Sequence, residues 1–311
     1  MSGITRRGFL RLAAGALVLR GVLRVSAEEG PRGLFSIPHP QYARPLGGGA
    51  FLVTWITDGG MSRLSVVSPE GTRDWASTGS ADGSLLHPQG VCRDEDGAVY
   101  VCDSRNGRVA VFDSEGKAQA PIGRMGFLPG QFHLPQGCDV RGTLLAVADT
   151  QNHRVQLIDT LTLDVQSVIG RLGDGDGEFR RPSDVAFVDD DTLWILDSGH
   201  GRALRYDLDG KPLSQLTVPV GAQGLMILPT PIPPQHGCQH IAGLEVHGDH
   251  MDCVVVTDTR GSRVLICAPD EFITYSVDGL SSPRGVCSDG EGGIVVCESG
   301  ANRLAIYSTP W

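Results

Sequence analysis

The stretch Val99–Phe112, VYVCDSRNGRVAVF, decides the fold of this chain of 311 residues. Two apolar runs flank the turn Ser104–Gly107, in which Asn106-Gly107 supplies the positive φ that a tight reversal needs. Asp103 ends the first run and Arg108 begins the second. Their side chains are expected to face each other across a β-hairpin, with Cβ atoms roughly 5 Å apart. The stretch therefore predicts a hairpin closed by an acid–arginine pair.

The same pattern, an acid followed after four residues by arginine, occurs six times. The acids are 45, 46, 48, 61 and 40 residues apart by their residue numbers. A period in the mid-forties is too long for one hairpin and suits a four-stranded blade. Six similar copies are explained more simply by the fold than by chemistry, so we interpret the pairs as structural. They are Asp58/Arg63, Asp103/Arg108, Asp149/Arg154, Asp197/Arg202, Asp258/Arg263 and Glu298/Arg303.

The segments around these hairpins repeat as well. Strand starts such as His87-Pro88-Gln89-Gly90 recur, and two glycine-rich connections end in Gly-x-Phe at Phe132 and Phe179, which are expected to fill gaps between blades. The order Pro-x-Gly-Val, Tyr-Val-x-Asp, Asn-x-x-Arg-Val, Gly-x-Phe resembles the NHL repeat, best in His133–Asp159. NHL repeats form β-propellers. The resemblance implies an all-β, six-bladed propeller with four-stranded antiparallel blades, spanning residues 33–311 as one domain.

The two ends of the chain are expected to meet in one blade. The last repeat ends at its third strand, Arg303–Tyr307, so Leu34–His39 is predicted to supply its outer strand and close the ring. We expect Arg32–Pro45 to be otherwise irregular. Blade five is expected to start near His240, after an insert at about residues 218–236 where the period stretches.

Residues 1–27 are predicted to be a targeting segment. Thr5–Leu10, TRRGFL, resembles the twin-arginine (Tat) export motif, Leu12–Leu19 is apolar, and Val25–Ala27 fits a cleavage site. The alternative is an ordinary amphipathic N-terminal helix. We expect an exported, periplasmic or extracytoplasmic protein, attached to a membrane only if the signal stays uncleaved.

The charge balance bears on partners. The formal net charge is −10, and without residues 1–27, which hold five arginines and no acid, it is −15. Such a surface repels phosphate backbones, so we do not expect nucleic-acid binding. We expect a monomer that binds a protein, a peptide or a small polar ligand.

Ligand-type residues gather in one segment. His236, Cys238 and His240 alternate, so in an extended segment they would point one way, and imidazole and thiolate suit zinc or copper. The alternative is solvated histidines and a buried cysteine. The acidic turns Asp94–Gly97 and Asp174–Glu178 have calcium-like chemistry, but neither matches a full EF-type loop. Zinc and calcium are thus the possible cofactors, and the acidic turns are interpreted as solvated.

Polar residues beside the blade-start prolines are expected to line the mouth of the central channel. Their variety is typical of a pocket for a small polar ligand. The alternative is that they bond only to trapped water. They are His87, Gln89, Gln136, Ser183, His240 and Arg284.

Export would permit disulfides. Cys92/Cys102 and Cys287/Cys297 share a spacing of ten residues in equivalent strands. Each pair is either a cross-strand disulfide or two buried thiols, and we favour the thiols.

Two functions fit the sequence. We favour a non-catalytic binding or scaffold protein that uses the channel mouth. The alternative is a metal-dependent lyase or hydrolase, because the repeats resemble the amidating lyase of peptidylglycine processing, a propeller enzyme that holds zinc with histidines around its channel. The corresponding blade-start positions here are Gln89, Gln136, Ser183, Ala242 and Arg284, so the resemblance does not extend to the zinc ligands.

Overall fold

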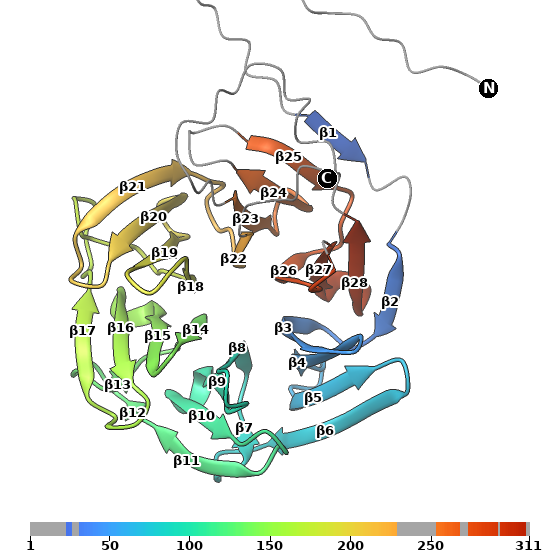
Figure 1. The fold of residues 1–311 in the computed structure, drawn as a ribbon, viewed down its shortest axis with the longest axis horizontal. Helices are drawn as coiled ribbons and strands as arrows, with labels where there is room; N and C mark the ends of the chain where they lie inside the picture. The colour runs from blue at the N-terminus through green and yellow to red at the C-terminus, as the bar shows by residue number, and fades with distance from the viewer. Residues whose placement is uncertain (1–22, 27–30, 229–252, 268–272, 292, 309–311) are drawn as a thin grey trace, which may run out of the picture.

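The computed structural model describes residues 23–26, 31–228, 253–267, 273–291 and 293–308. These residues form six blades arranged in a ring, each built on a four-stranded antiparallel sheet, with short extra strands at some edges (Figure 1). Five of the sheets use four strands that follow one another in the chain, and the sixth combines the last three strands with β2 (Gly33–Ser36). The predicted all-β six-bladed propeller is therefore confirmed. The helices in the described part are single 3₁₀ turns, as at Ser104–Asn106, Thr150–Asn152 and Ser299–Ala301.

Each blade runs from an inner strand at the ring axis to an outer strand at the rim (Figure 1). The inner strands are β3 (Pro40–Gly47), β8 (Pro88–Arg93), β14 (Cys138–Arg141), β18 (Asp184–Phe187), β22 (Leu225–Leu228) and β26 (Pro283–Ser288). The second strands are β4 (Ala50–Ile56), β9 (Val99–Asp103), β15 (Leu144–Asp149), β19 (Thr192–Asp197), β23 (Cys253–Asp258) and β27 (Gly293–Glu298).

The third and outer strands complete the blades. The third strands are β5 (Ser62–Ser68), β10 (Arg108–Phe112), β16 (Arg154–Asp159), β20 (Arg202–Asp207), β24 (Arg263–Cys267) and β28 (Arg303–Ser308). The outer strands are β6 (Gly71–Thr78), β11 (Ala118–Ile122), β17 (Val165–Ile169), β21 (Pro212–Thr217), β25 (Ile273–Asp278) and β2 (Gly33–Ser36). Short strands β7 (Ser84–Leu85), β12 (Arg124–Met125) and β13 (Gln131–Phe132) lie in the connections between blades.

The core lies between neighbouring blades, because the second strands are buried on both faces. All five residues of β9 and all six of β27 are buried, whereas five of the six in β21 are exposed. Phe132 is fully buried against Cys102 of β9 and Leu145 of β15, so it fills the gap between the second and third blades as predicted. Apolar burial of this kind contributes about 25 cal/mol per Å².

The N-terminal part closes the ring as predicted. β2 pairs antiparallel with β28, with Leu34 opposite Ala305 and Ser36 opposite Arg303. The observed strand, Gly33–Ser36, is shorter than the predicted Leu34–His39. The pairing covers the edge that an open array would present.

The expectation that Arg32–Pro45 is irregular is wrong. This range contains β2 and the start of β3, the inner strand of the first blade. The signal was present in the sequence, because His39-Pro40-Gln41 repeats the strand start His87-Pro88-Gln89.

The expected start of blade five is also wrong. Its inner strand is β22, which pairs with β23 and follows Ala222-Gln223-Gly224, a match for Pro135-Gln136-Gly137 of the third blade. The predicted insert at 218–236 therefore contains the blade start. Gln223 takes the place predicted for His240, and His236, Cys238 and His240 lie outside the described residues.

A further strand, β1 (Leu23–Ser26), pairs parallel with the outer strand β25. These four residues fall within the predicted targeting segment 1–27, whose other residues lie outside the described part of the chain. Export and cleavage stay predictions. Among the residues that the structure describes, no helix is long and apolar enough to cross a membrane.

Candidate functional site

Hairpin ion pairs hold the strand starts at the channel mouth. In five of the six predicted pairs, acid and arginine lie 2.7 to 2.9 Å apart, and the acid side chains are at most 5% exposed. Asp103 also accepts the backbone N–H of Leu86 at 2.6 Å, and Asp149 accepts that of His133 at 2.7 Å. Because Leu86 and His133 lie just before the blade-start prolines, each acid ties its hairpin to the start of its own inner strand.

Burial raises the pKa of Asp103, although the bonds from Leu86, Asn106 and Arg108 act in the opposite direction. Its carboxylate accepts Asn106 Nδ2 at 2.7 Å and Arg108 Nε at 2.8 Å. The turn itself follows the prediction, since Gly107 adopts the left-handed conformation with φ 63°. A buried carboxylate that accepts this many hydrogen bonds has a structural role. The motif of an acid followed after four residues by arginine is the sequence signal for that role.

The first hairpin departs from the pattern. Asp58 lies 2.8 Å from His39 Nε2, and Arg63 lies 3.3 Å from Asp74. The reason is register: Arg63 is opposite Trp55 in the β4–β5 ladder, whereas in the second blade Arg108 is opposite Asp103. Asp58 falls beyond the end of β4, where Arg63 does not reach it.

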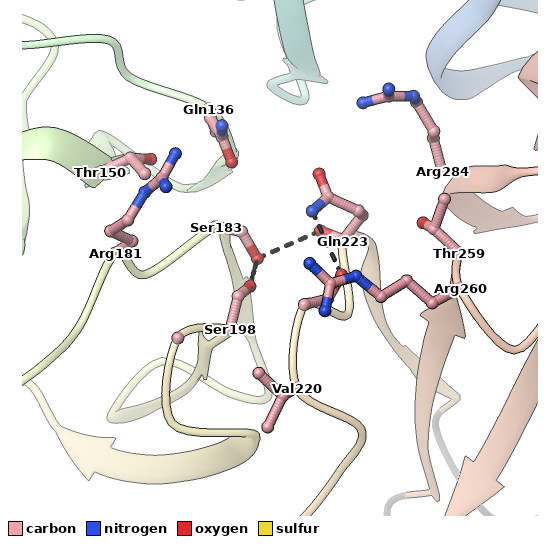
Figure 2. A pocket seen from close by; sticks show the side chains of 12 residues that line it. Gln136, Thr150, Arg181, Ser183, Ser198, Val220, Gln223, Thr259, Arg260 and Arg284 are labelled. Atoms are coloured by element: carbon pink, nitrogen blue, oxygen red, sulfur yellow. Dashed lines mark hydrogen bonds between the residues drawn. The ribbon is translucent and has the colours of Figure 1, made fainter.

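A cavity of about 310 Å³ lies at the channel mouth (Figure 2). We call it the mouth cavity. Its wall comes from the starts of inner strands, the ends of second strands and the loop before β22. It is lined by Gln136, Thr150, Arg181, Ser183, Ser198, Gly199, Val220, Gly221, Gln223, Thr259, Arg260 and Arg284.

Of the residues predicted to line the channel mouth, some line the mouth cavity and others lie outside its lining. Gln136, Ser183 and Arg284 line the mouth cavity. Gln89 is 7% exposed and its side-chain amide contacts His87 Nδ1 at 3.2 Å, so these two residues bond to each other outside the lining. Burial, with Arg105 and Arg284 next in effect, lowers the pKa of His87.

Hydroxyl groups stiffen one wall of the mouth cavity. Ser183 and Ser198 form a short hydroxyl–hydroxyl contact (Figure 2). Ser198 also donates to the carbonyl of Ala222 at 2.6 Å. Thr259 donates to the carbonyl of Pro283 at 2.6 Å. These bonds join the fourth blade to the loop before β22, and the fifth blade to the sixth.

Beneath the mouth lies a group of ionisable side chains that the sequence analysis missed, with Arg44 and Asp139 half-buried and Asp184 buried. Arg44 lies 3.6 Å from Asp139, and Asp184 accepts the backbone N–H groups of Val185 at 3.0 Å and Leu225 at 2.9 Å. Burial raises the pKa of Asp184 to about 8. An acid at the start of an otherwise apolar inner strand was the available signal.

Cys92, Cys102, Cys287 and Cys297 are buried free thiols, as the sequence analysis favoured, and neither pair forms a disulfide. Cys92 is opposite Tyr100 and Cys287 is opposite Val295, so in each ladder the second cysteine lies two residues further along. Cys92 Sγ instead lies 3.5 Å from Cys138 Sγ. Burial raises the pKa of the Cys92 thiol, which is typical of a structural cysteine.

The described part of the chain contains no group of three ligand-type side chains placed to hold a metal. In the acidic turns, Asp174 contacts Arg180 at 2.9 Å and His200 at 2.8 Å, and Asp94 accepts Tyr100 Oη at 3.0 Å. Cations and hydroxyls of the chain itself thus engage these carboxylates. The zinc prediction at His236, Cys238 and His240 concerns residues outside the described ranges.

Comparison with known proteins supports the repeat. Residues 85–112 match the family model of the NHL repeat. NHL repeat-containing protein 2 of Gallus gallus is 26% identical over 243 residues, which is 67% of this chain and 33% of that protein. The chain therefore spans about one third of the length of this relative.

Solved structures share the propeller fold at low identity. Virginiamycin B lyase from Staphylococcus aureus with quinupristin has a TM-score of 0.59 and 13% identity, covering 89% of this chain and 85% of the lyase. A chain of a nidogen/laminin complex has a TM-score of 0.55 and 13% identity, covering 78% of this chain and 80% of that one. One neighbour is an enzyme and the other a protein complex, so the fold is compatible with either function.

Proposed function

We propose that this propeller is a non-catalytic binding protein whose mouth cavity takes a small polar ligand or the end of a peptide. The observation that carries the proposal is the mouth cavity itself, about 310 Å³ in volume and walled by polar side chains. That size lies at the lower end of the range typical of small-molecule sites. The side chains along its wall are guanidinium, amide and hydroxyl groups and one apolar residue, Val220.

This chemistry favours binding. Guanidinium, amide and hydroxyl groups donate and accept hydrogen bonds, but they do not exchange protons near neutral pH without an activating partner. The bonds from Ser198 and Thr259 to backbone carbonyls hold the wall in place before a ligand arrives. A preformed wall reduces the entropy lost on binding.

We further propose that the protein acts after export through the Tat pathway, outside the cytoplasm. The support is the TRRGFL segment at Thr5–Leu10 and the apolar residues that follow it. Fusing residues 1–27 to a reporter that is active only after folded export tests this. Replacing Arg6 and Arg7 by lysine is expected to abolish export of the reporter.

The cavity proposal is tested by filling the cavity. Val220 is 57% exposed and lines the mouth cavity, so Val220→Trp is expected to occupy it without disturbing the core. A library of short peptides and small polar molecules is screened for stabilisation against heat. Ligands that raise the midpoint of unfolding of the natural chain are expected to have no effect on the variant.

The matched control is Leu213→Trp, because Leu213 is 47% exposed on β21 and lies outside the cavity lining. Ligands that stabilise all three proteins equally would show that the mouth cavity is not the binding site. Each ligand that binds is also incubated with the protein and analysed for conversion. Turnover would replace the binding proposal by the lyase or hydrolase alternative.

The metal-dependent alternative has its own test. Elemental analysis of the purified chain would have to find a stoichiometric metal that is lost in the His236→Ala and His240→Ala variants. The likeness to virginiamycin B lyase concerns the fold, at 13% identity.

A further inference from the structure

We infer that the mouth cavity is selective for a small polyanion, such as a di- or tricarboxylate, bound by Arg181, Arg260 and Arg284. This inference deepens the proposed function and rests on it. Guanidinium groups bind carboxylates and phosphates through paired, charge-assisted hydrogen bonds.

The three arginines reach the mouth cavity from three different blades. Arg181 precedes Pro182 at the start of the fourth blade, Arg260 lies in the turn between β23 and β24, and Arg284 follows Pro283 in β26. Figure 2 shows Arg260 and Arg284 extending into the cavity from one side and Arg181 lying on the other. A ligand with acidic groups at both ends could therefore meet guanidinium groups on opposite walls.

These arginines have no carboxylate partner within the described residues, unlike the arginines of five hairpins. The lining includes neither aspartate nor glutamate. The Nε of Arg284 is buried without a hydrogen-bond partner, which is a costly state for a charged group. Arg181 and Arg260 are exposed, so water solvates them when the cavity holds no ligand. An anion in the mouth cavity would supply the Arg284 guanidinium with the counter-charge that the described residues do not provide.

The neutral side chains of the wall add few hydrogen-bond acceptors, so hydrogen-bond donors predominate in the mouth cavity. The hydroxyls of Ser198 and Thr259 already donate to the carbonyls of Ala222 and Pro283. The side-chain amide of Gln136 forms no hydrogen bond within the described part of the chain. The groups that remain for a ligand are therefore three guanidiniums, the Gln136 amide and the part of the Gln223 amide that is not bonded to the carbonyl of Gly221. The three guanidiniums favour an acceptor-rich molecule.

The nearby buried acid does not cancel this charge. Asp184 follows Ser183, but its carboxyl oxygens accept the N–H groups of Val185 and Leu225. Burial raises the pKa of Asp184 to about 8, which weakens the negative charge that this group carries near neutral pH. The net charge of −10 repels long polyanions from the surface as a whole. A cavity of about 310 Å³ accordingly selects a small anion.

The test is calorimetric titration of the purified chain with citrate, and separately with pyrophosphate, at low salt. We expect one citrate per chain, with affinity that falls as salt is added. Arg284→Gln and Arg260→Gln are each expected to weaken binding at least tenfold. Arg124→Gln is the matched control, because Arg124 is exposed on β12 outside the lining, and its affinity is expected to match the natural chain.

The outcomes separate the two proposals. If pyrophosphate binds through the same arginines and citrate does not bind, the ligand is a phosphate-type polyanion and not a carboxylate. If neither anion binds, or if the arginine variants bind as well as Arg124→Gln, the inference is wrong. If neither anion binds, but a neutral ligand binds the natural chain and Arg260→Gln and fails to bind Val220→Trp, the proposed binding function stands and the inference of a polyanion is wrong. Since Arg260 is exposed, its variant keeps the test valid should Arg284→Gln not fold.

Discussion

At the scale of single residues, a buried carboxylate has more effect on this fold than an exposed one in the same sequence pattern. The Asp103 side chain is 0% exposed and accepts bonds from Leu86, Asn106 and Arg108. Asp58 stands in the same sequence pattern but is 93% exposed and contacts His39 alone among charged groups of the described residues. The same sequence motif is therefore expected to contribute differently to stability in the two hairpins, depending on whether its carboxylate is buried.

Asp103→Ala is expected to destabilise the fold by roughly 3 to 5 kcal/mol, because it removes the buried partner of Arg108 and leaves the Nε–H of Arg108 and the backbone N–H of Leu86 without their acceptor. Asp58→Ala is expected to change stability by less than about 0.5 kcal/mol, since exposed ion pairs contribute little. Thermal and urea unfolding of both variants measures the difference. Equal effects would contradict the structural role assigned to the buried pairs.

At the scale of elements, the inner strands meet through backbone close to the ring axis. The N–H of Gly90 in β8 donates to the carbonyl of Gln136 at 2.6 Å. A Cβ on Gly90 would lie 2.6 Å from that oxygen and 2.9 Å from Gly137 Cα. The glycine after the blade-start proline therefore permits neighbouring inner strands to approach, and that approach sets the width of the mouth.

Gly90→Ala is expected to lower stability by about 1 to 3 kcal/mol, because its Cβ would collide with backbone that has little freedom to move. Gly59→Ala is the matched control. The nearest atom to a Cβ there is Thr57 Oγ1 at 3.8 Å, and Gly59 does not have a left-handed φ. The midpoints of thermal unfolding compare the two. A Gly90 variant as stable as the Gly59 variant would show that the inner strands separate at little cost.

At the scale of the whole molecule, the ring is closed by residues from both ends of the chain. β2 provides the outer strand of the blade that β26, β27 and β28 begin, and Phe35 of β2 packs edge-on against Phe51 of β4 with ring centres 5.9 Å apart. β2 thus contacts both the last blade and the first. Without it, β28 would be an unpaired edge strand.

Deleting residues 1–36 is expected to lower the midpoint of thermal unfolding and to promote self-association through the β28 edge. Deleting residues 1–30 is the control, because it removes β1 as the longer deletion does but keeps β2. Light scattering after size-exclusion chromatography measures the association. A monomeric protein with an unchanged midpoint after the longer deletion would mean that closure by β2 is dispensable.

The sequence by itself determined the class of fold, the number of blades and the closing strand. Those features follow from local signals that repeat, namely a turn with a left-handed residue such as Gly107 and an acid and arginine placed to meet across it. The comparison of His39-Pro40-Gln41 with His87-Pro88-Gln89 could also have identified β3. Hairpin geometry depends on residues that are close together in the chain. A sequence repeat therefore gives several independent indications of the same geometry.

Only the tertiary structure decided the register of the first hairpin and the composition of the mouth cavity. Arg181, Arg260 and Arg284 lie in three blades, and their convergence depends on how inner strands pack around the axis. Arg181 precedes a blade-start proline, as His87 does, but nothing local to Arg260 indicates that it faces the same cavity. Contacts between distant segments depend on packing between blades, which a repeat pattern leaves open.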